Sequence, residues 1–173
     1  MSNNFDNSSS RQQRGNIRTV HDISTTSNLF SSVIMSVVEG RGKAKGEIGL
    51  AYIDLNSPIL HLVQFRDNCS FDSLKMKCHV CQPVQIIYPN TLTQNNMMMS
   101  SLVESFPDTN FCPFDRRFFN EKRGLEFVKT LCYKDYTGID IELESKYYCL
   151  SACSALLQYV YLEKKVFTVQ YAV

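Results

Sequence analysis

The stretch Val33-Ile34-Met35-Ser36-Val37-Val38 decides the fold of this chain. An apolar run of this length, rich in β-branched residues, predicts a buried strand. Three glycines interrupt the pattern within the segment Gly40–Gly46 that follows it. Beyond them, Glu47–Leu55 has the composition of a second strand, so the sequence predicts a hairpin with the glycine-rich segment at its turn.

Strand and helix patterns continue downstream of the hairpin. Ile59–Phe65 alternates as a third strand does, which extends the hairpin to a three-stranded antiparallel meander. Five further elements follow: a helix from near Ser70 to Cys78, a strand at Val84–Tyr88, a helix at Leu92–Phe106, a strand at Thr109–Phe114 and a helix at Asn120–Tyr133. A meander followed by alternating helices and strands predicts an α/β domain, in which helices flank a mixed sheet.

The last predicted helix, Ile141–Lys164, is long and carries apolar residues at three-to-four spacing. Such a stripe needs partner helices, so we expect it to be the first helix of an incomplete all-α domain. Residues 1–30 are rich in Asn, Ser and Gln, which predicts a disordered polar tail. The expected organisation is therefore this tail, an α/β domain over residues 31–137, and the truncated helical segment over residues 138–173.

Charge and cysteine content exclude some classes of protein. The 173 residues include 18 basic and 17 acidic ones, and a net charge of +1 argues against histone-like electrostatic binding of nucleic acid. No apolar run is long enough to span a bilayer, so no membrane association is expected. Seven cysteines without a secretion signal indicate reduced thiols in an intracellular protein.

The glycine-rich segment carries three cations, Arg41, Lys43 and Lys45. It is not a P-loop, because Val37 and Ala44 occupy the positions that require glycine and Ser or Thr. A hairpin turn with solvated cations is the favoured interpretation. A weak contact of these three side chains with nucleic-acid phosphate remains the alternative.

Cys78-His79-Val80-Cys81 has the spacing of half a zinc site. The other cysteines offer no second pair two residues apart, so buried thiols are favoured over a metal. The sequence predicts no metal-binding residue.

Carboxylates could support a different chemistry. Glu39 and Asp54, helped by Asp72, Asp115 or Glu121, would form the metal site of a nuclease if the sheet brought them together. Solvated carboxylates at strand ends are the favoured interpretation, and we expect no catalytic or cofactor-binding residue.

An aromatic cluster lies between the last predicted strand and the following helix. Its members, with two interleaved arginines, are Phe111, Phe114, Phe118, Phe119, Arg116 and Arg117. A stacking surface for single-stranded nucleic acid is one interpretation. Packing of the rings into the core, with the arginines at the surface, is the favoured one.

Three blocks of this sequence resemble the connector domain of the MutS homologues, and in particular their meiotic branch. They are Val38–Gly42 with Gly46–Gly49 and Ile53–Leu55, then Arg117–Glu121 with Gly124–Glu126, and finally Ser145–Ala152, which resembles the start of the family's helical lever domain. The likeness runs from about residue 33 to residue 159. It implies a ribonuclease-H-like α/β connector without nuclease activity.

The resemblance also implies a role. Meiotic MutS homologues pair as a heterodimeric clamp that embraces branched recombination intermediates, including Holliday junctions, and promotes crossovers in the nucleus. The family's DNA-dependent ATPase, with its ATP and Mg²⁺, and its main DNA-binding helices have no matching positions here, so we expect a non-catalytic fragment. MutL-type proteins are further implied partners. The alternatives are a metal-dependent nuclease of ribonuclease-H-like fold and an autonomous, weak nucleic-acid-binding domain.

Overall fold

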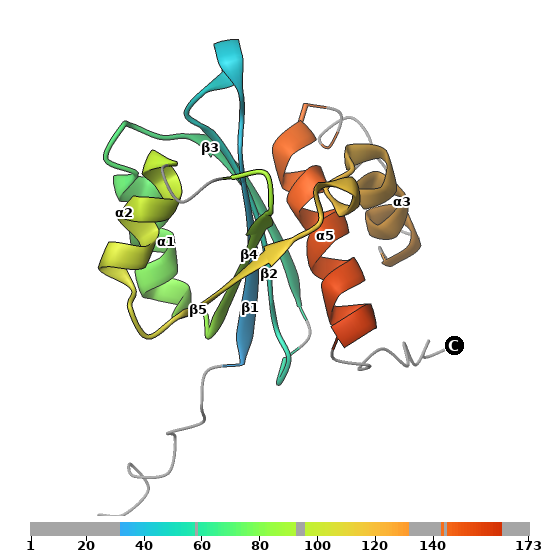
Figure 1. Ribbon diagram of the computed structural model, residues 1–173. Coiled ribbons are helices and arrows are strands. Elements are labelled where there is room, and N and C mark those ends of the chain that lie inside the picture. Colours follow the sequence, from blue (N-terminus) through green and yellow to red (C-terminus); the bar gives the residue numbers. More distant parts are fainter. Residues whose placement is uncertain (1–31, 58, 93–95, 132–142, 144, 164–173) are drawn as a thin grey trace, which may run out of the picture. The chain divides into compact units, whose positions relative to one another are not determined.

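Strand β1 (Val33–Glu39) lies at the centre of a five-stranded sheet whose order is β3-β2-β1-β4-β5 (Figure 1). The structure is a computed structural model that describes residues 32–57, 59–92, 96–131, 143 and 145–163. These residues belong to one compact unit, Ser31–Val173. The predicted tail, residues 1–30, lies outside the described residues, as do residues 132–142 and 164–173.

The first half of the sheet is antiparallel. Strands β2 (Glu47–Asp54) and β3 (Leu60–Arg66) follow β1, and β2 pairs antiparallel with both neighbours. In the register of β1 and β2, Val33 is opposite Asp54 and Glu39 is opposite Ile48. The predicted meander is confirmed, and the glycine-rich segment forms its first turn around a short 3-10 helix, η1 (Gly42–Ala44).

The second half of the sheet is parallel. Strand β4 (Gln85–Pro89) pairs parallel with β1, and β5 (Asn110–Phe114) pairs parallel with β4. Helix α1 (Asp72–Cys81) precedes β4, and α2 (Met97–Ser105) connects β4 to β5. The predicted mixed sheet with flanking helices is therefore confirmed.

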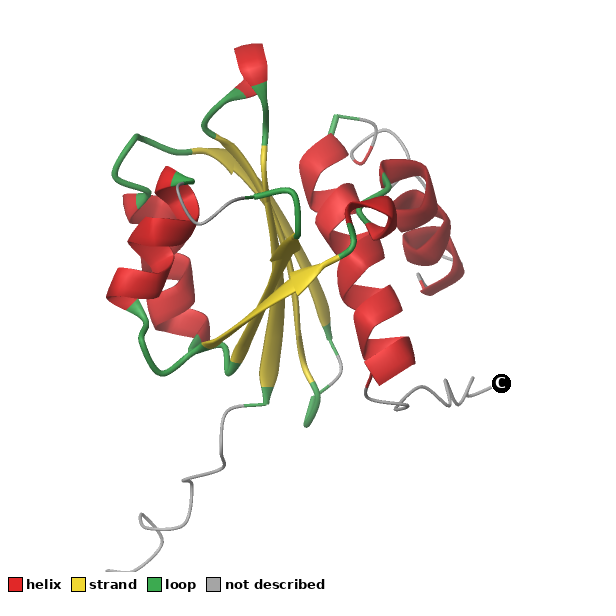
Figure 2. Ribbon diagram, viewed as in Figure 1, coloured by secondary structure: helices red, strands yellow, loops and turns green. Residues whose placement is uncertain are grey.

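Helices α1 and α2 cover one face of the sheet (Figure 2). Met35 and Val37 of β1 point to this side, where they join a core formed with Leu74 of α1 and Leu102 of α2. The intervening side chains of β1 point to the opposite face. This alternation explains why β1 is apolar almost without interruption: both of its faces are buried.

The other face is covered by α5 (Tyr147–Glu163), and α3 (Glu121–Leu131) packs against α5. Ile34 and Val38 of β1 pack on this side, together with Ala152 and Leu156 of α5, which are fully buried. The sequence predicts α5 as part of a second domain that begins at residue 138, and this prediction is wrong. The helix belongs to the same compact unit as the strands because its apolar side chains cover the sheet.

Side chains from the sheet fix the position of α5. The Oε1 atom of Gln64 in β3 accepts hydrogen bonds from the backbone N–H groups of Tyr148 and Cys149, at 2.9 and 3.3 Å. These N–H groups have no partner within the first turn of a helix, so Gln64 caps the helix from the sheet. Deeper in the core, Gln85 Nε2 of β4 donates to the hydroxyl of Tyr159 at 2.6 Å.

Candidate functional site

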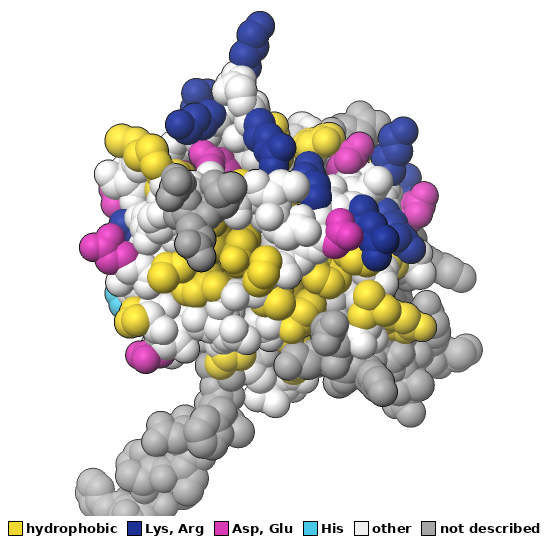
Figure 3. Space-filling model, viewed as in Figure 1, with side chains coloured by type: hydrophobic (Ala, Val, Ile, Leu, Met, Phe, Trp, Pro, Cys, Tyr) yellow, Lys and Arg dark blue, Asp and Glu magenta, His cyan; other side chains and the backbone are white. Residues whose placement is uncertain are grey.

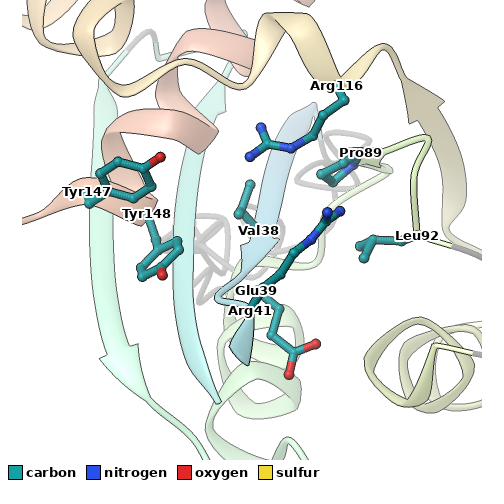
Figure 4. A pocket seen from close by; sticks show the side chains of 8 residues that line it. All are labelled: Val38, Glu39, Arg41, Pro89, Leu92, Arg116, Tyr147 and Tyr148. Carbon is teal, nitrogen blue, oxygen red and sulfur yellow. The ribbon is translucent and has the colours of Figure 1, made fainter. Parts of the chain in front are cut away.

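The sheet has a topological switch point between the parallel strands β1 and β4. From the carboxyl end of β1 the chain turns to β2 on one side, and from that of β4 it continues through α2 to β5 on the other. Crevices at such points are the usual ligand sites of open α/β sheets. Here a pocket of about 220 Å³ lies at this position (Figure 4). Its lining residues are Val38, Glu39, Arg41, Pro89, Leu92, Arg116, Tyr147 and Tyr148.

Arg41 reaches the pocket from the turn between β1 and β2. Its backbone is extended, and Gly40 before it is closely packed, since a Cβ there would lie 2.2 Å from the carbonyl oxygen of Ala44. The Arg41 Nη2 atom donates to the hydroxyl of Thr91 at 2.7 Å. The arginine is thereby tied to the turn that follows β4.

Arg116 enters from η2 (Arg116–Phe118), the short 3-10 helix after β5. Its backbone N–H donates to Asn90 Oδ1 at 3.2 Å, and its Nη1 donates to the carbonyl oxygen of Phe119 at 2.7 Å. The guanidinium carbon lies 5.9 Å from the centre of the buried Phe119 ring. Two hydrogen bonds and one ring contact thus position Arg116. Its side chain extends toward Val38 and the two tyrosines (Figure 4).

Glu39 supplies the one carboxylate among the residues that line this pocket. Its Oε1 atom is buried and accepts no hydrogen bond from any described residue. Among the described residues, neither Arg41 nor Arg116 has a carboxylate oxygen within 4.0 Å. In Figure 4 the carboxylate points away from the Arg116 guanidinium, and Glu39 also lines a second pocket beside Lys45. Within the part of the chain that the structure describes, the two cations of the first pocket therefore have no paired carboxylate.

The start of α5 completes the wall of the pocket with two aromatic rings. Tyr147 and Tyr148 meet edge to face, with ring centres 5.1 Å apart. Tyr147 is exposed and Tyr148 is half-buried. The pocket consequently combines two guanidinium groups, aromatic surface and phenol hydroxyls.

The three predicted cations do not all reach the pocket. Lys43 and Lys45 lie in the turn between β1 and β2, where their side chains are exposed, and only Arg41 lines the pocket. Lys and Arg side chains gather along the edge of the molecule that carries this turn (Figure 3). Sequence reasoning missed Arg116, Tyr147 and Tyr148 as pocket residues. The signal that could have found Arg116 is its place directly after a parallel strand, at the edge where ligands gather.

The structure contradicts the proposed pair of Glu39 and Asp54. Asp54 is opposite Val33 at the start of β1, whereas Glu39 is at its end, so the two residues lie about 20 Å apart along the strand. The described residues contain no group of three or more His, Cys, Asp or Glu side chains that could hold a metal ion. The pair therefore cannot form one metal site, and this contradicts the nuclease interpretation that depends on it.

Cys78 and Cys81 lie on α1, and their environments differ. Cys78 is fully buried, with its Sγ 3.8 Å from the sulfur of Met35, while Cys81 is half-buried and His79 is exposed. Burial, followed by the nearby Cys81, raises the pKa of Cys78 to about 12. Because a neutral thiol is a poor metal ligand, this environment suits a structural core residue.

The aromatic cluster packs into the core, as the favoured interpretation predicts. Phe119 is buried, and Phe114 stacks on Phe118 with ring centres 4.6 Å apart. Arg117 lies 4.7 Å from the Phe118 ring centre and forms an ion pair of 3.3 Å with Asp115. Stacked rings that face one another leave little surface for bases.

Comparison with known proteins gives one family for most of the chain. The family model described as MutS domain II matches residues 32–167. Among solved structures, the chain is similar to the catalytic core domain of the HTLV-2 integrase, with 10% identity and a TM-score of 0.32 over 69% of this chain and 84% of that one. Within the part of the chain that the structure describes, no helix combines the length and apolar character that a membrane crossing requires.

The chain is also similar in sequence to three curated proteins of the MutS family. The chain is 42% identical over 144 residues to MutS protein homolog 4 of Mus musculus, and 42% identical over 132 residues to that of Homo sapiens. It is 29% identical over 142 residues to DNA mismatch repair protein MSH4 of Arabidopsis thaliana. The matches cover 79%, 75% and 79% of this chain but only 15%, 14% and 18% of the respective relatives. The chain thus corresponds to one segment of much longer proteins.

Proposed function

Because the chain belongs to the MutS family, whose domain II it matches, we propose that it is the non-catalytic connector of a MutS homologue 4-type protein. The observation that carries this proposal is the 42% identity to two mammalian homologues over most of the chain. The wide separation of Glu39 and Asp54 along the strands supports a structural role rather than nuclease chemistry.

In this role the domain transmits conformational changes between the ATPase and the DNA clamp of the intact protein. That protein pairs with a second meiotic MutS homologue, and the heterodimer closes as a clamp around branched recombination intermediates such as Holliday junctions. It acts on chromosomes in the nucleus, and its ATPase, with ATP and Mg²⁺, lies outside this chain. MutL-type proteins are further partners. The sheet supports such transmission because helices brace it on both faces.

A domain exchange tests the proposal. Residues 32–167 of this chain should replace domain II of the mouse homologue without loss of heterodimer formation, and the heterodimer should still be retained on Holliday-junction DNA in an ATP-dependent manner. The matched control is the same exchange carrying Gly124→Ala, which disturbs the packing of α3 on α5. A folded exchange protein that forms the heterodimer but no longer holds the junction would contradict the connector role.

A second role is a weak contact with nucleic acid by Arg41, Lys43 and Lys45, which is favoured by the exposure of all three on one turn. Each phosphate contact steepens the salt dependence of binding. Replacing Lys43 and Lys45 with Ala should therefore make the negative slope of log K against log salt shallower by about two for a bound duplex. A slope that is unchanged in the double variant would rule out these lysines.

A further inference from the structure

We propose that the pocket between β1 and β4 is a binding site for a phosphate group, held between Arg41 and Arg116. The proposal goes beyond the connector role and does not depend on it. The pocket is here called the switch-point pocket and is defined by the eight residues that line it.

The charge of the pocket favours an anionic ligand. Two guanidinium groups share a pocket in which, among the described residues, neither pairs with a carboxylate. Like charges brought together in a partly enclosed space repel one another, and an anion placed between them removes that repulsion. Arginine is especially suited to phosphate, because its planar fork of N–H donors matches two oxygen atoms at once.

Hydrogen bonds within the protein already position both arginines of the pocket. The turn after β4 holds both arginines: Thr91 accepts a hydrogen bond from the Arg41 side chain, and Asn90 accepts one from the Arg116 backbone. Arg116 is further anchored at Phe119. Among the described residues, each guanidinium group donates a hydrogen bond to the protein from one of its nitrogen atoms, and its remaining N–H groups can donate to a ligand.

The size and the lining of the pocket also suit a phosphate group. A volume of about 220 Å³ equals the space of about seven water molecules in the liquid, which is smaller than the range of about 300–1,000 Å³ for drug-sized ligands. A phosphate group with part of an attached sugar fits this space. Tyr147 and Tyr148 add hydroxyl donors and aromatic surface at one wall (Figure 4). The same chemistry serves a free phosphate compound and a phosphodiester of a nucleic-acid strand.

Substitution of Glu39 distinguishes direct binding of phosphate by the arginines from binding through a metal ion, because the two predict opposite changes in phosphate affinity. Glu39 lines the pocket and its negative charge opposes a bound anion, so Glu39→Gln should strengthen phosphate binding. If Glu39 instead served as a metal ligand that recruits phosphate, the same substitution would weaken binding.

The test is calorimetric titration of the full chain with inorganic phosphate at low ionic strength. We expect saturable binding to one site, weakened about tenfold or more by Arg41→Ala and by Arg116→Lys, since each change removes charge-assisted hydrogen bonds. Arg123→Ala is the matched control, because it removes one exposed cation of α3 that does not line the pocket. Thermal melting of each variant confirms that it is folded, and Arg41→Ala changes only an exposed side chain.

Competition then separates the two sources of phosphate. A DNA duplex that displaces inorganic phosphate from the wild-type chain, but not from Arg41→Ala, identifies a backbone phosphodiester as the ligand. Displacement by a nucleoside monophosphate and not by the duplex identifies a free phosphate compound. Absence of saturable phosphate binding, or equal weakening by Arg123→Ala, would overturn the proposal.

Discussion

Asp54, at the end of β2, is a carboxylate whose partners are local. The Ser32 hydroxyl donates to its Oδ1 atom, and so does the backbone N–H of Asn56, at 2.9 Å. The Ser32 hydroxyl is the larger and the Asn56 N–H the smaller of the two causes that lower the pKa of Asp54 below its ordinary value of 3.8. The residue thus secures the end of the β1–β2 ladder.

This hydrogen bonding predicts a pH dependence. Because the folded-state pKa of Asp54 is lowered, its contribution to stability is fully present above pH 3.8 and is lost as the pH falls through the lowered pKa. Ser32→Ala should shift the pKa of Asp54 back toward 3.8, as measured by NMR titration of its carboxyl carbon. Ser57→Ala, at an exposed site nearby, should leave it unchanged. An unaltered pKa in Ser32→Ala would show that the hydroxyl is not the cause.

At the scale of elements, α5 is the helix that joins the layers of the fold. It contacts the sheet on one side and α3 on the other, and side chains around most of its circumference are buried. Two glycines make these contacts close. A Cβ at Gly49 of β2 would lie 2.2 Å from the carbonyl carbon of Tyr148, and one at Gly124 of α3 would lie 1.9 Å from the carbonyl oxygen of Leu150.

Gly124→Ala should therefore destabilise the domain. The methyl group meets backbone atoms of α5, which cannot rotate aside, so the helices must separate at a cost of about 3 kcal/mol. Better helix propensity returns about 1 kcal/mol, leaving a net loss of about 2 kcal/mol in the free energy of unfolding. Urea denaturation measures this loss. Lys122→Ala, at an exposed site of the same helix, should change stability by less than about 0.5 kcal/mol.

Periodicity predicted the elements well because it reports directly on local burial. The run around Met35 and the composition of Glu47–Leu55 identify strands whose faces are buried, and the structure confirms both. The partner of α5 was not predictable in this way, since an apolar stripe shows which side of a helix is buried and not what buries it. The expected helix at 92–106 begins only at Met97, where Asn96 accepts a hydrogen bond from Met99 as the cap.

The candidate site shows where local patterns stop being informative. The separation of Glu39 and Asp54 was predictable, because the end of one antiparallel strand is opposite the start of the next. The switch-point pocket was not predictable, since Arg41 and Arg116 line the same pocket only through the order of strands β1, β4 and β5. Strand order depends on crossover connections, which leave no periodic signal in the sequence.

At the scale of the whole molecule, the packing of α5 predicts the effect of truncation. A chain that stops at Lys146 lacks the helix that covers Ile34, Val38 and Ile53, so it should lose cooperative thermal unfolding and bind the dye ANS. A chain that begins at Ser31 retains the compact unit and should melt as the full chain does. Calorimetry of both truncated chains measures this difference, and a cooperative transition in the shorter chain would assign α5 to a separate domain after all.

The cap that Gln64 provides for α5 has a consequence for synthesis. The hydrogen bond from the Tyr148 backbone to Gln64 joins residues 84 positions apart, so the ribosome completes all five strands well before their covering helix exists. During that interval the nascent sheet has an uncovered apolar face, which is the kind of surface that chaperones protect. Because closing so long a loop precedes the gain from packing, refolding in solution should be slow compared with that of a helical bundle of similar size.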